Sequence, residues 1–187
     1  MYKLYSKKDI HIWKRDFDNT ISDILKSKDK NKNNYSINRL NLDEIEEISI
    51  IYFEDKIVAF SSIWHRELIY PKNTYRVLNR AWKHETLRWR KPAYWEISKL
   101  MLDHQIKIAQ QLNIDNIFIS SEGNKKKWIQ KWVSGANKDG KNFNVIDGMV
   151  KVCNGDKKSC WQHVAYMNLN NEIPNFEIMT YQQWLNE

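Results

Sequence analysis

The fold is decided by residues 75–120, YRVLNRAWKHETLRWRKPAYWEISKLMLDHQIKIAQQLNIDNIFIS. Residues 75–82 alternate with a period of two and carry polar side chains on both faces, as in an edge strand or a strand that lines a cleft. Residues 93–112 change to helical spacing, because their apolar side chains recur at steps of three and four. Residues 114–120 are almost continuously apolar, as in a strand covered on both sides. This order predicts a parallel pair of strands joined by a crossover helix.

A hairpin is predicted upstream of this unit. Residues 48–53 and 57–63 are apolar, β-branched runs, and the polar residues 54–56 between them suit a reverse turn. Farther upstream, helical spacing from residue 7 to residue 25 predicts a helix that covers one face of the sheet.

Length and composition predict one domain over residues 1–187. The chain has 187 residues, of which 42% are hydrophobic and 13% aromatic, which is ample for one core. No run of eighteen apolar residues is present, and the first four residues lack the apolar stretch of a signal peptide. We therefore expect a soluble, cytoplasmic protein that does not bind membranes.

The two cysteines, Cys153 and Cys160, flank a short polar segment and can face each other near the tip of a hairpin. A disulfide is geometrically feasible, but a reducing cytosol favours two free thiols, which is our expectation. Two cysteines without an adjacent pair of histidines do not form a zinc site, so no metal is expected.

Positive charge is concentrated between residues 72 and 91. The formal net charge of the chain is +7, and this segment holds seven Lys or Arg residues against one acid, Glu85. Such a cluster attracts a polyanion, and both coenzyme A and nucleic acid are candidates. The seven cations are Lys72, Arg76, Arg80, Lys83, Arg88, Arg90 and Lys91.

The order of these elements resembles the GNAT family of N-acetyltransferases. The resemblance implies an α+β fold with a mixed central β-sheet, an antiparallel N-terminal hairpin, a parallel strand pair around the crossover helix, and flanking helices. Residues 143–153 and 161–169 are then expected to form the closing β-hairpin, and residues 181–184 a terminal helical turn.

The coenzyme turn of the family has the form Q/R-x-x-G-x-G/A, where backbone amides at a helix N-terminus hold the pyrophosphate of acetyl-CoA or another acyl-CoA. The chain matches this turn at Arg88 and at Ala93 but carries Lys91 where glycine is usual. Arg88, Arg90 and Lys91 can supply by charge what the backbone turn loses. A second family signature is an asparagine after the next strand, and Asn124 matches it. The resemblance therefore implies that the coenzyme is bound by Arg88, Arg90, Lys91, Ala93 and Asn124.

The general acid of the family is a tyrosine about seven residues after that asparagine. Lys131 occupies this position, although Gly135 matches the glycine that follows it. Three alternatives stay open: another group protonates the leaving thiolate, water does so, or acyl transfer is lost. Lys131 itself is a candidate acid if it is buried, but as a surface residue it would leave the role to water or to Tyr94 in the basic turn.

The candidate general bases lie on or after the strands that would line the cleft. His65 follows the second hairpin strand and His84 follows the third strand; the ordinary pKa of histidine suits this role. Glu85 is the carboxylate alternative.

Two functional classes follow from the resemblance. The first is an N-acyltransferase that transfers an acetyl or other acyl group from acyl-CoA to an amine, whose identity the sequence does not indicate. The second is a GNAT-fold protein that has lost catalysis and binds nucleic acid through its basic segment. The departures at Lys91 and Lys131 favour the second class, and the preserved order of elements favours the first.

Overall fold

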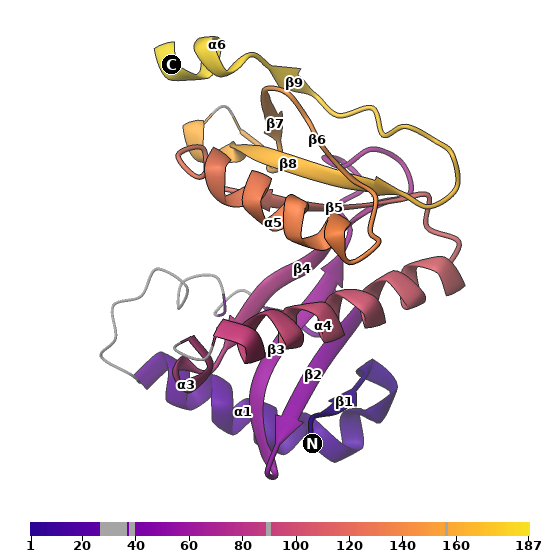
Figure 1. Ribbon diagram of the computed structural model, residues 1–187, viewed down its shortest axis with the longest axis vertical. Helices are drawn as coiled ribbons and strands as arrows, with labels where there is room; N and C mark the ends of the chain where they lie inside the picture. Colours follow the sequence, from indigo (N-terminus) through magenta and orange to yellow (C-terminus); the bar gives the residue numbers. More distant parts are fainter. Residues whose placement is uncertain (27–36, 38–39, 89–90, 156) are drawn as a thin grey trace. The chain divides into compact units, whose positions relative to one another are not determined.

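The computed structural model describes residues 1–26, 37, 40–88, 91–155 and 157–187. Their contacts group into two compact units, which can be followed along the ribbon in Figure 1. Unit 1 comprises Met1–Trp64 and Val77–Ile108, and unit 2 comprises His65–Arg76 and Ala109–Glu187. That the chain acts as a single domain stays a prediction.

Unit 1 is built on the strands β1 (Lys3–Tyr5), β2 (Glu47–Phe53), β3 (Lys56–Trp64) and the second part of β4 (Thr74–Lys83). β2 pairs antiparallel with both β1 and β3, and β4 lies next to β3. β1 was not anticipated from the sequence. The predicted hairpin is confirmed, since β2 and β3 are joined by Glu54 and Asp55, whose φ angles of 48° and 61° are those of a type I′ turn.

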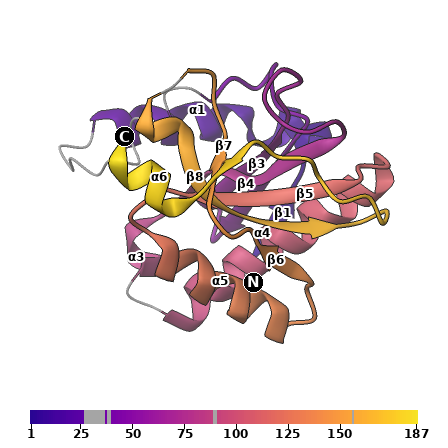
Figure 2. The same ribbon diagram turned by 90° about the horizontal axis from the view of Figure 1, so that it is seen from above.

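Two helices cover opposite faces of the unit 1 strands (Figure 2). They are α1 (Ile10–Lys26), which follows the short helix η1 (Lys7–Asp9), and α4 (Lys91–Gln111), which follows α3 (Glu85–Arg88). The strand side chains alternate between the two faces, so each helix has its own core. The α1 core contains Trp13, Phe17, Ile48, Ile50 and Phe60, and the α4 core contains Ile51, Ala59, Leu87, Ile97 and Met101.

Unit 2 contains the predicted parallel pair. Thr74–Arg76 of β4 pairs in parallel with β5 (Asn116–Ser121), and the chain between them forms α3 and α4. β5 is also antiparallel to β8 (Trp161–Asn168), so the sheet is mixed. The remaining elements are α5 (Lys126–Lys138), β6 (Phe143–Val145), β7 (Met149–Lys151), η2 (Lys158–Cys160), β9 (Ile178–Met179) and α6 (Tyr181–Asn186). Among the described residues, none of the helices is long and apolar enough to cross a bilayer.

The expected pairing of residues 143–153 with residues 161–169 is present, but residues 143–153 form two strands with a break between them. β6 and β7 are two short strands, and both pair antiparallel with β8. Gly148 separates them with a φ of +112°, a left-handed conformation that breaks the strand. A side chain at this position would lie 2.6 Å from the carbonyl oxygen of Met179, so β9 leaves room for glycine alone.

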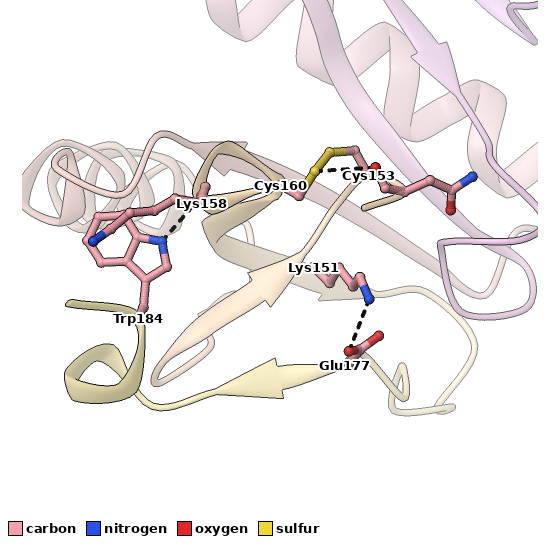
Figure 3. Close-up of a disulfide and its surroundings, with 7 residues drawn as sticks. Lys151, Cys153, Lys158, Cys160, Glu177 and Trp184 are labelled. Atoms are coloured by element: carbon pink, nitrogen blue, oxygen red, sulfur yellow. Dashed lines mark hydrogen bonds and ion pairs between the residues drawn. A yellow bond between two sulfur atoms is a disulfide. The ribbon is translucent and has the colours of Figure 1, made fainter. Parts of the chain in front are cut away.

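The expectation of two free thiols is wrong, because Cys153 and Cys160 form a disulfide (Figure 3). Their Cα atoms lie 4.9 Å apart. The end of β7 and the start of β8 bring them together, since the amide of Val152 donates to the carbonyl oxygen of Cys160 at 2.7 Å. The expectation rested on the redox compartment, whereas the pairing follows from the geometry of the hairpin.

Candidate functional site

The connection from β4 to α4 collects the predicted site residues of unit 1. His84 follows β4, and its amide donates to the carbonyl oxygen of Val58 at 2.8 Å while its ring lies edge-on to Trp82. Glu85 begins α3 and is exposed. These contacts hold His84 at the end of the strand, as the sequence led us to expect.

Only part of the predicted coenzyme turn lies within the residues that the structure describes. Ala93 lies in the first turns of α4 and is half-buried against the α4 core, so its small side chain fits a closely packed helix start. The side chains of Arg88 and Lys91, and all of Arg90, lie outside the described residues. Their role therefore stays a prediction.

Lys83, the last residue of β4, has a more specific environment than the sequence indicated. Its ammonium Nζ lies 3.2 Å from the carbonyl oxygen of Tyr94, bonds to the hydroxyl of Ser98, and lies 3.4 Å from the centre of the Tyr94 ring. All these partners are neutral, and no carboxylate of the described residues pairs with this amine. Burial lowers the pKa of Lys83 to about 7. In the sequence this residue is one of seven neighbouring cations, and nothing marks it out.

Tyr94, a candidate acid, contacts the Lys83 amine through both its carbonyl oxygen and its ring. It lies one turn into α4 and is exposed, and the face of its ring covers the amine of Lys83. The structure thus places Tyr94, Lys83 and Ser98 in one cluster at the start of the helix.

His65 lies in unit 2, in the segment that leads from β3 to β4. Its Nδ1 lies 2.9 Å from the carbonyl oxygen of Thr74, and its ring stacks on Tyr75 at 4.5 Å. A carbonyl oxygen can only accept, so Nδ1 carries the proton and the lone pair of the neutral imidazole is on Nε2. The contact with Thr74 therefore fixes the tautomer that a base acting through Nε2 needs.

Asn124 also lies in unit 2, exposed between β5 and α5. The preceding residue, Gly123, is enclosed: His163 Nε2 donates to its carbonyl oxygen at 2.9 Å, and a side chain here would meet the Trp184 ring at 2.2 Å. Ser121, at the end of β5, is buried, and its hydroxyl has no hydrogen-bond partner among the described residues. Sequence reasoning missed both the enclosed glycine and this unsatisfied hydroxyl.

Lys131 is exposed on α5, whose buried side is formed by Ile129, Val133 and Ala136. The buried environment that a lysine acid would require is not found. The alternative weighed for this position, a solvated lysine on the outer face of the helix, agrees with the structure.

Neither a sequence-family model nor a curated protein matches the chain. Solved structures do match. A GNAT-family acetyltransferase from Staphylococcus aureus Mu50 is 16% identical, with a TM-score of 0.51 over 91% of this chain and 100% of that one. A GNAT-family acetyltransferase from Streptococcus pneumoniae is 12% identical, with a TM-score of 0.54 over 90% and 100%. The ribosomal-protein-S18-alanine N-acetyltransferase from Escherichia coli is 8% identical, with a TM-score of 0.53 over 92% and 96%. At these identities the likeness concerns the fold: the chain has the mixed α+β fold of GNAT acetyltransferases, as its sequence predicted.

Proposed function

From this fold we propose that the protein is an N-acyltransferase that transfers an acyl group from acyl-CoA to an amine. The observation that carries the proposal is the match of 91% of the chain to the whole of a GNAT acetyltransferase. The parallel pair of β4 and β5, with α4 in the chain between them, is the part of the sequence that suggested the family. All three neighbours described above are named as acetyltransferases.

The residues around the start of α4 fit the phosphates of an acyl-CoA. No acidic residue lies in the first turn of the helix, and the positive end of the helix dipole favours an anion there. Lys83 adds an amine whose described partners are all neutral. An anion beside it would offset the desolvation that lowers its pKa and would keep it charged. We therefore assign Lys83, with Arg88, Arg90 and Lys91, to the phosphates, and Asn124 to the coenzyme as well.

Acyl transfer needs a base for the acceptor amine and an acid for the departing thiolate. His65 is the candidate base whose tautomer is fixed, because Thr74 holds the proton on Nδ1. His84 and Glu85 are the other candidates. On the acid side, Tyr94 is the side-chain candidate and water is the alternative, whereas the exposed position of Lys131 argues against its use.

The proposal is tested by titration calorimetry with acetyl-CoA at low and moderate salt, on the unaltered protein, on Lys83→Met and on the matched surface control Lys131→Met. We expect the unaltered protein and the control to bind equally. Lys83→Met should bind at least tenfold more weakly, since a charge-assisted contact contributes about 1.5–3 kcal/mol. No binding of acetyl-CoA by the unaltered protein would refute the proposed function.

A further inference from the structure

β4 is strained in its middle. Leu78 and Arg80 have φ angles of 50° and 52°, in the left-handed region that residues with a side chain disfavour by about 1–2 kcal/mol each. Left-handed residues within a strand redirect its amides, as β-bulges do, and such irregularities occur next to active sites. This strained strand leads to Lys83 and to the start of α4.

The amide of Leu78 is held by a side chain of α4. It donates to Oε1 of Gln105 at 2.7 Å. Gln105 is fully buried, and its Nε2 donates to the hydroxyl of Ser49 on β2 at 3.1 Å and to that of Ser61 on β3 at 2.9 Å. One glutamine therefore connects α4 to three strands of unit 1, and both its oxygen and its nitrogen are satisfied.

The orientation of the Gln105 amide in this network is determined. Because a backbone amide only donates, Oε1 of Gln105 must face Leu78, and Nε2 must face the serines. Ser49 accepts from Gln105, and its hydroxyl also lies within hydrogen-bonding distance of Nδ1 of His104, at 2.9 Å. The glutamine consequently has a single orientation, which fixes the amide of Leu78.

We propose that Gln105 is a positioning residue of the acyltransferase, which holds β4 in the strained conformation on which binding of the acyl donor depends. The inference rests on the proposed function. A network that served stability alone would have no need of two left-handed residues in the strand it holds, because their conformation opposes folding. The bond from Leu78 to Gln105 instead stabilises this geometry, and it does so on the strand that carries Lys83.

The test compares Gln105→Met with Ser61→Ala. Methionine has a similar volume and no acceptor suited to an amide, so the Leu78 N–H loses its partner. Ser61→Ala removes one bond of the same glutamine and keeps the bond to Leu78. The readouts are the melting temperature, the hydrogen exchange of the Leu78 amide, and the acetyl-CoA dissociation constant.

We expect Gln105→Met to speed exchange of the Leu78 amide at least tenfold and to raise the dissociation constant at least tenfold. Ser61→Ala should leave both within about twofold, although its melting temperature falls as well. Equal binding by Gln105→Met and the unaltered protein would overturn the proposal, and so would equal weakening in the two variants. If Gln105→Met does not fold, Gln105→Glu replaces it: it keeps an oxygen for Leu78 and should retain binding, and loss of binding in a folded Gln105→Glu would contradict us.

The two proposals fail in distinguishable ways. If the unaltered protein binds no acetyl-CoA, the proposed function is wrong, and with it any role of Gln105 in binding. The exchange rate of Leu78 still decides whether the glutamine holds the strand.

Discussion

Replacing Lys83 by methionine should stabilise the protein at neutral and acidic pH. Burial lowers the pKa of Lys83 from 10.5 to about 7, so the folded chain binds this proton less tightly than the unfolded chain. The resulting loss of stability is fully present below about pH 7 and disappears as the pH rises toward 10.5. At about 1.4 kcal/mol per tenfold difference in proton affinity, it amounts to at most about 5 kcal/mol. The contact of the amine with the Tyr94 ring offsets about 0.5–2 kcal/mol of this.

The assay is urea unfolding followed by tryptophan fluorescence at pH 6 and pH 9, for the unaltered protein, Lys83→Met and the exposed control Lys131→Met. Relative to Lys83→Met, the unaltered protein should gain about 3 kcal/mol of unfolding free energy between the two pH values. All other titrating groups are common to the two proteins, so this difference isolates Lys83. A difference that does not change with pH, or a Lys83→Met protein less stable at pH 6, would show that the bonds to Tyr94 and Ser98 outweigh the desolvation of the amine.

Three further predictions concern other parts of the chain. Gly123→Ala should displace the Trp184 ring and lower the melting temperature, which near-ultraviolet circular dichroism and thermal unfolding would show; an unchanged melting temperature would contradict the close contact. Reducing the disulfide between Cys153 and Cys160 should cost about 2.5 kcal/mol of unfolding free energy, as expected for a short loop; unfolding with and without reductant measures this, and equal values would count against the pairing. Oligonucleotides, tested at low and moderate salt by fluorescence anisotropy, should bind more weakly than acetyl-CoA; tight, steeply salt-dependent binding would instead favour the nucleic-acid-binding alternative.

The regular elements could be predicted because each shows its own period. The hairpin around Glu54 and Asp55 and the helical spacing of α4 are local patterns, and the structure agrees with both. β1 and β9 were missed because three-residue and two-residue strands are too short to show a period; pairing with longer strands defines them. The break between β6 and β7 lies at Gly148, whose φ of +112° and close approach to Met179, in a distant segment of the chain, are shown by no local pattern.

The candidate site was predictable only where it coincides with a family motif. Ala93 and Asn124 were predicted in this way; the structure places Ala93 in the first turn of α4 and Asn124 between β5 and α5, and their binding role stays a prediction. Lys83 and Gln105 were missed, because the property that singles them out is burial beside particular partners. A lysine in a basic segment and a glutamine in an amphipathic helix are ordinary residues in a sequence, and only the packing of β4 on α4 distinguishes them.

The bonds of Lys83 to Ser98 and of Leu78 to Gln105 identify α4 as the element that fixes the geometry of β4. Ser98 and Gln105 are seven residues apart, so they lie two turns from each other on the same face of the helix. One bonds to Lys83 at the end of β4 and the other to Leu78 in its strained middle. Both polar side chains are buried beside the apolar residues that attach α4 to the sheet. Replacing the apolar residues on this face of α4 should therefore change stability alone. Replacing Ser98 or Gln105 should also change the conformation of β4, the strand on which the proposed donor site is built.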